Sequence, residues 1–199
     1  MKINSVAIKI IVFAVIVLSA CTVDLVVKEI VSMQLVDDII VIPGFWSFHL
    51  TLNNDMGFSL LRFTDSFLDK DVKKVIIITL QLIGVTIAGF FYFSKGKFLS
   101  PWLKRLPLAF ICAGGLGNAI DRIIRGYVID YVLWYYGDFS WPVFNLADVY
   151  SVIGVAFLVF FIFFMEKEKK KKIENPPTDA TPNQDVKEGE STSNPENTV

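Results

Sequence analysis

Two aspartates stand in strongly apolar surroundings, and each of them follows an asparagine by three positions. Asp121 ends the stretch "GGLGNAID" after Asn118, and Asp148 lies near the start of a long apolar run after Asn145. A carboxylate at the centre of a membrane costs roughly 2.5–3.5 kcal/mol, and residues that bear this cost usually have a function. A spacing of three places both side chains on one helix face, where the amide can donate to the carboxylate.

Two carboxylates held close together could catalyse the hydrolysis of an amide. Because both cannot ionise easily, the pair shares one proton and offers a base and an acid at the same pH. The base can deprotonate a water molecule that attacks the carbonyl, and the acid can protonate the carbonyl oxygen and assist the leaving amine. Two alternatives stay open on spacing alone. The acids could line a proton or ion path, or they could pair with basic residues for assembly, as Asp121 with Arg122 or Asp24 with Lys28.

The elements that would position these acids are membrane helices. The chain has 199 residues, 53% of them hydrophobic, and a mean hydropathy of +0.52. The apolar residues come in blocks that approach or reach the roughly 20 residues needed to cross a bilayer. We therefore predict an all-α membrane protein with one membrane domain, residues 1–165. Its four transmembrane helices are predicted over residues 8–27, 75–93, 106–124 and 143–165.

The distribution of lysine and arginine predicts the orientation of the spans. Basic residues gather at the amino terminus, in the loop 94–105 and after residue 165, so both termini should face the cytoplasm. The ends of the spans that carry Asp121 and Asp148 then lie toward the opposite face. Antiparallel helices could bring the two acids together there, and Gly114 and Gly117 would permit a close approach.

The connecting segments have compositions of their own. The loop 37–63 is rich in β-branched and aromatic residues, which predicts short extracytoplasmic strands at the membrane surface. The segment 125–142 is dense in Trp and Tyr, which is typical of the headgroup region. Residues 166–199 are predicted to form a disordered cytoplasmic tail. Its lysine run, Lys169–Lys172, is interpreted as an anchor for the last span rather than a headgroup-binding site.

Metal chemistry is not indicated by the sequence. There is one histidine, His49, and the two cysteines, Cys21 and Cys112, both lie in apolar blocks. We expect no metal, no cofactor and no nucleic-acid partner.

Three motifs, "GGLGNAIDR", "GYVIDYV" and "WPVFNLAD", strongly resemble those of bacterial lipoprotein signal peptidase, also called signal peptidase II. The likeness covers about residues 5–165 and includes the four-span layout. It implies an aspartic endopeptidase of the bacterial inner membrane that needs no cofactor. The peptide bond cut would be the one just before the diacylglyceryl-modified cysteine of a prolipoprotein, near the outer face. The resemblance also implies inhibition by the cyclic peptide globomycin, and we expect a monomer whose other partners are membrane lipids.

The resemblance places the family's two catalytic aspartates on Asp121 and Asp148. One departure concerns the loop pattern that begins at Asn53, where Asp55 replaces the usual glycine and Met56 replaces a small residue. Supporting or substrate-binding positions fall on Asn118, Arg122, Asn145, Ala147, Asn53, Asp24, Lys28 and Asp130, with Gly114 and Gly117 at the helix contact.

Two other functions compete with a peptidase. In a small proton-coupled membrane transporter, Asp24, Lys28, Asp121 and Asp148 would line a path, but no inverted or parallel repeat supports this. In a non-enzymatic assembly or lipid-binding protein, the same acids would only pair with basic residues.

Overall fold

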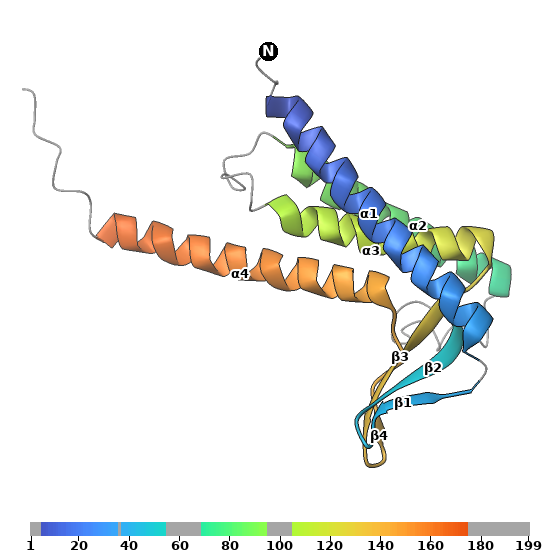
Figure 1. Ribbon diagram of the computed structural model, residues 1–199. Helices are drawn as coiled ribbons and strands as arrows, with labels where there is room; N and C mark the ends of the chain where they lie inside the picture. The colour runs from blue at the N-terminus through green and yellow to red at the C-terminus, as the bar shows by residue number, and fades with distance from the viewer. Residues whose placement is uncertain (1–4, 36, 55–68, 95–104, 175–199) are drawn as a thin grey trace, which may run out of the picture. The chain divides into compact units, whose positions relative to one another are not determined.

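Four long helices carry the apolar blocks of the sequence. The computed structural model describes residues 5–35, 37–54, 69–94 and 105–174, and the helices are α1 (Ser5–Gln34), α2 (Lys70–Phe93), α3 (Leu106–Ile124) and α4 (Leu146–Glu174) (Figure 1). Each of the four contains a stretch long and apolar enough to cross a membrane. Four such helices were predicted, and each predicted span overlaps one of them.

A small antiparallel sheet completes the fold. Its strands follow the order β1 (Ile39–Ile42), β2 (Trp46–Asn53), β3 (Val128–Tyr136) and β4 (Phe139–Ser140). Figure 1 shows these strands together, beyond the end of α1 and beside the start of α4. Two of the strands, β1 and β2, lie in the loop between the first two predicted spans, where short strands were expected.

The sheet also contains two strands that the sequence analysis did not predict. The aromatic segment between α3 and α4, assigned there only to the headgroup region, forms β3 and β4. Its β-branched and aromatic residues favour strand structure, and β3 pairs along most of β2. The fold is therefore not all-α outside a single loop: two segments far apart in the sequence build one sheet.

Helix α3 is the interior helix of the first of two compact units, Met1–Ile162. It packs against both α1 and α2, and 61% of its apolar stretch is buried, against 11–22% for the other three helices. The outer faces of α1, α2 and α4 expose large aliphatic and aromatic side chains. That distribution is expected of helices whose outer faces meet lipid rather than water.

Glycines in α3 allow its neighbours to come close. A Cβ atom on Gly114 would collide with the Ala147 carbonyl oxygen and the Ser151 side chain of α4. A Cβ atom on Gly117 would lie 2.8 Å from Asp24 Oδ2 of α1 and 3.2 Å from Ala147 Cβ. Both glycines thus lie where α3 is in close contact with neighbouring helices.

The second compact unit is Phe163–Val199, whose described part continues α4 to Glu174. Disorder was predicted from residue 166, so this prediction is wrong for residues 166–174. Lysine and glutamate are good helix formers, and residues 166–175 contain neither glycine nor proline. The remainder of the predicted tail, residues 175–199, lies outside the described residues.

Candidate active site

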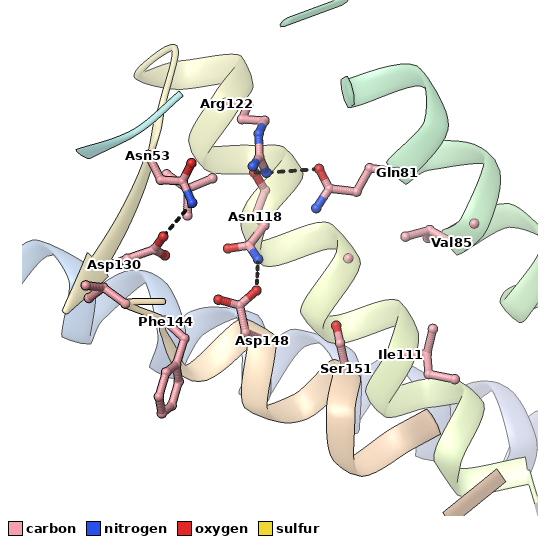
Figure 2. A pocket seen from close by; sticks show the side chains of 14 residues that line it. Asn53, Gln81, Val85, Ile111, Asn118, Arg122, Asp130, Phe144, Asp148 and Ser151 are labelled. Carbon is pink, nitrogen blue, oxygen red and sulfur yellow. Dashed lines mark hydrogen bonds between the residues drawn. The ribbon is translucent and has the colours of Figure 1, made fainter. Parts of the chain in front are cut away.

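A cavity of about 320 Å³ lies between α2, α3, the sheet and the start of α4. Its wall is largely apolar, with polar side chains contributed by five different elements. Figure 2 shows several of these side chains converging on one space. The polar residues that line it are Asn53, Gln81, Asn118, Arg122, Asp130 and Asp148.

Asp148 reaches the cavity from the first turn of α4. Its position is fixed by a reciprocal pair of bonds with Asn145: the Asp148 N–H donates to Asn145 Oδ1 (3.0 Å), and the Asn145 N–H donates to Asp148 Oδ2 (3.1 Å). This is the capping-box arrangement, which satisfies the unpaired N–H groups at a helix start. The Asn118 Nδ2 of α3 donates to the other oxygen, Asp148 Oδ1, at 2.8 Å (Figure 2).

Asp130 enters the same cavity from β3 and is only 2% exposed. The Asn53 Nδ2 donates to one oxygen at 2.7 Å, and the Asn145 Nδ2 donates to the other at 2.6 Å. The first contact follows from strand register, because Asn53 lies opposite Val128, one diagonal step from Asp130. A backbone bridge between Val132 and Phe144 holds the chain just before α4 against β3.

The surroundings of Asp130 favour its protonated form. Burial raises the pKa of this carboxyl to about 7, the amide donors of Asn53 and Asn145 oppose the rise, and the negative charge of Asp148 adds to it. Near neutral pH this carboxyl can therefore hold a proton beside a second carboxylate.

Asp121 does not reach the cavity. It is fully buried and is not among the residues that line the cavity; its Oδ2 lies 2.9 Å from Lys28 Nζ and its Oδ1 accepts from Arg125. The structure thus corrects the expected pairing of Asp121 with Asp148: two cations enclose Asp121, and Asp130 takes its place in the cavity. Arg125, rather than Arg122, is its arginine partner.

The two Asn-x-x-Asp pairs are therefore crossed. Asn118 donates its amide to Asp148 on the next helix instead of to Asp121, and Asn145 donates its amide to Asp130 and to Asn118 Oδ1 (3.0 Å). It is the backbone N–H of Asn145, not its side-chain amide, that donates to the Asp148 carboxylate. The expectation that each asparagine side chain donates to the acid on its own helix is wrong, because both amides donate to acids on other elements.

The remaining expected residues surround this centre. Lys28 and Asp24 form the predicted ion pair (2.7 Å), and the Ala147 N–H donates to Asp24 Oδ1 at 2.9 Å. Arg122 lines the cavity and donates to Gln81 Oε1 at 3.2 Å (Figure 2). Sequence reasoning missed Gln81, the one amide side chain of α2. The loop positions 55, 56, 58 and 59 lie outside the described residues.

Comparison with known proteins agrees with this architecture. The family described as "Signal peptidase (SPase) II" matches residues 15–164. The chain belongs to the signal peptidase II family. It is 32% identical to the "Lipoprotein signal peptidase" of Xanthomonas campestris pv. campestris (strain 8004) over 131 residues, which are 66% of this chain and 74% of that protein. It is 35% identical to the protein of that name from Xylella fastidiosa (strain M12), over 61% of this chain and 70% of the relative.

Solved structures of two bacterial membrane enzymes share the fold of this signal peptidase II family member. One, 26% identical, superimposes with a TM-score of 0.59 over 76% of this chain and 92% of its own. Another, 24% identical, superimposes with a TM-score of 0.63 over 82% of this chain and 93% of its own, and is evidence of a shared fold alone. Membership of a peptidase family favours the peptidase over the transporter and assembly alternatives.

A second cavity, of about 230 Å³, adjoins the first in this family member. Both are lined by Phe144 and Asp148, but apart from that acid the second has only apolar walls, formed by the β3–β4 hairpin and the lipid-exposed side of α4. Among the described residues, no group of three or more His, Cys, Asp or Glu side chains could hold a metal ion. The chemistry that the described site offers is that of two carboxyl groups in one cavity.

Proposed function

We propose that this chain is an aspartic endopeptidase of the bacterial inner membrane that removes signal peptides from prolipoproteins. The bond cut is the one before the diacylglyceryl-modified cysteine. Membership of the signal peptidase II family and the names of the curated relatives support the substrate class. The observation that carries the proposal is the pair Asp130 and Asp148, which line one cavity and are joined through two asparagine amides.

The catalytic pair is thus Asp130 and Asp148 instead of Asp121 and Asp148. The Asp148 carboxylate, whose two oxygens both accept N–H bonds, acts as the base toward water. The hydroxide equivalent attacks the carbonyl carbon, and the proton of Asp130 passes to the carbonyl oxygen. When the tetrahedral intermediate collapses, the leaving amine takes the proton that Asp148 received, and Asp130 recovers its own. The raised pKa of Asp130 suits it to start this cycle protonated.

The depth of the site suits a substrate that is itself anchored in the membrane. Asp148 lies in the first turn of α4 and Asp130 in a strand outside the spans, so the reaction occurs where water can enter. With both termini in the cytoplasm, this boundary is at the outer face. The apolar second cavity, which shares Asp148, supports a lipid-bearing substrate.

Each chain supplies both acids of the pair, which supports action as a monomer. No step of the proposed reaction requires a metal or a cofactor. Inhibition by globomycin is expected of a family member with this activity.

A cleavage assay on the purified full chain tests the proposal. The substrate is a prolipoprotein that already bears its diacylglyceryl group, and the same prolipoprotein without the group is the matched control. We expect the parent to cleave only the lipidated form. Asp130→Asn and Asp148→Asn each remove one proton-transfer group and should lower the rate by about 10³-fold, within the range for general acid–base groups.

Asp121→Asn separates the two assignments of the pair. We expect it to lower the unfolding temperature, because it removes a buried partner of Lys28 and Arg125, while retaining measurable cleavage. A folded Asp121→Asn protein without activity, together with an active Asp130→Asn protein, would return the catalytic role to Asp121. A parent that leaves the lipidated substrate intact would refute the proposed function.

A further inference from the structure

The Lys28 ammonium group contacts the neutral side-chain amide of Asn118 as well as two carboxyl groups. Its side chain is fully buried, and its Nζ lies 2.7 Å from Asp24 Oδ2 and 2.9 Å from Asp121 Oδ2. The ammonium group also donates a hydrogen bond to Asn118 Oδ1 at 2.9 Å. This bond satisfies a donor of the buried ammonium group and at the same time binds the amide oxygen of Asn118.

The hydrogen bond from Lys28 determines which way the side-chain amide of Asn118 faces. Lysine can only donate, so the amide oxygen must face Lys28, and the amide nitrogen must point the other way, to Asp148 Oδ1. The reverse orientation would direct two N–H groups at each other and a carbonyl oxygen at a carboxylate. Asn145 Nδ2 also approaches Asn118 Oδ1, but it is shared with Asp130 and lies closer to that acid (2.6 Å against 3.0 Å).

We propose that Lys28 is a positioning residue for the acid pair: through Asn118 it fixes the hydrogen bond that orients the Asp148 carboxylate in the cavity. The inference rests on the proposed function and deepens it. Lys28 is fully buried and is not among the residues that line the cavity, so it contacts no substrate there. Its loss should therefore lower kcat and leave KM nearly unchanged.

The test compares two variants that share one substitution. Asp24→Asn alone keeps Lys28 and its bonds to Asp121 and Asn118. Asp24→Asn with Lys28→Met removes the donor together with one acid, so net charge is conserved and Asp121 keeps Arg125. Asp24→Asn is the reference for the double variant, so any effect of losing the Asp24 carboxylate is common to both proteins. Relative to Asp24→Asn, the double variant should lose about 10- to 100-fold in kcat, the range for a hydrogen bond to a charged group, with KM changed less than about threefold.

A double-mutant cycle separates positioning from a merely structural role. The same Lys28→Met change is made in Asp24→Asn proteins that carry Asn118 or Asn118→Ala, and unfolding temperatures are measured for all four. If Lys28 acts through Asn118, its removal lowers kcat only where Asn118 is present. An equal loss of kcat in both backgrounds would overturn the proposal, as would a double variant as active as Asp24→Asn.

If the Lys28→Met protein does not fold, Asn118→Asp carries the test. The introduced carboxylate would still accept from Lys28 but has no N–H for Asp148, so a folded protein with a loss of about tenfold or more in kcat is expected. Parent-like kcat in this variant would overturn the proposal. The parent is assayed beside every variant. A parent that does not cleave refutes the proposed function, whereas a cleaving parent with unaffected variants refutes the role of Lys28 alone.

Discussion

At the residue scale, the environment of a carboxyl decides its role more than the motif that carries it. Asp121 and Asp130 are both buried, yet Asp121 is enclosed by Lys28 and Arg125, whereas Asp130 receives neutral amide donors and has the charge of Asp148 beside it in the cavity. An acid that shares a cavity with a second acid can exchange a proton near neutral pH.

The raised pKa of Asp130 predicts a specific pH dependence of stability. The unfolded chain releases this proton near about pH 3.9, whereas the folded protein releases it at about 7. Between these values the folded state binds more protons, so the stability contributed by Asp130 is fully present below about pH 4 and is lost as pH rises to about 7. Relative to Asp130→Asn, the unfolding temperature of the parent should fall across this interval.

Thermal unfolding of both proteins in detergent from about pH 4 to 8 measures this difference. Asp138→Asn, which removes an exposed acid in the turn between β3 and β4, is the control for the loss of one carboxyl group outside the cavity. Parallel curves for the parent and Asp130→Asn would show that Asp130 has an ordinary pKa in the folded protein.

At the element scale, two contacts between elements bring Asp130 and Asp148 together. The Val132–Phe144 bridge ties the start of α4 to β3, and the small residues of α3 let α4 approach closely enough for Asn118 to reach Asp148. The first fixes Asp148 relative to Asp130, and the second fixes it relative to α3. Neither contact takes part in proton transfer, yet the arrangement of the site depends on both.

Gly114→Ala should disturb the close contact between α3 and α4. The added Cβ would collide with the Ala147 carbonyl oxygen and with Ser151, whose backbone nitrogen would lie 2.9 Å away, so α3 and α4 must separate. We expect a loss of about 1–3 kcal/mol in stability from overpacking, and reduced cleavage because the Asn118–Asp148 bond lengthens. Unfolding temperature and cleavage rate measure the two effects.

Gly89→Ala is the matched control, because a Cβ atom at Gly89 in α2 would meet nothing within 4 Å. Alanine is also the better helix former, so this variant should be as stable as the parent or slightly more stable. A Gly114→Ala protein indistinguishable from it would mean that the α3–α4 contact tolerates a methyl group.

At the scale of the whole molecule, the sheet and the ends of the spans that carry the acids should lie on one side of the membrane. The excess of Lys and Arg at the amino terminus, in the loop 94–105 and after residue 165 predicts that those parts face the cytoplasm. An even number of spans is required for both termini to share a side, and the four helices meet that requirement.

Cysteine labelling in intact cells tests this topology. Asp138→Cys, in the exposed turn between β3 and β4, should react with a membrane-impermeant maleimide added outside. Ser94→Cys, at the opposite end of α2, should react only after the membrane is permeabilised. The parent is the unlabelled control because both of its cysteines are buried. The reverse pattern of labelling would invert the proposed orientation.

The sequence by itself determined the membrane class, the four spans, the strands after the first span and the family. Each of these depends on local composition or on short contiguous motifs. The length of an apolar block indicates a membrane span, and "GNAIDR" and "FNLAD" can be recognised in the sequence without knowledge of the fold. The glycines of α3 were likewise identified as contact points, because only their small size allows a close approach.

Only the tertiary structure decided which acid joins Asp148. Asp130 was noted as a supporting position, but a strand inserted beside helix ends gives no periodic signal that it faces a cavity. Its place depends on the register of β3 against β2 and on the bridge to Phe144, and the burial of Asp121 depends on Lys28 from a distant helix. The side-chain amides of both asparagines and one oxygen of Asp121 have partners on other elements, so spacing along the chain could not identify those partners.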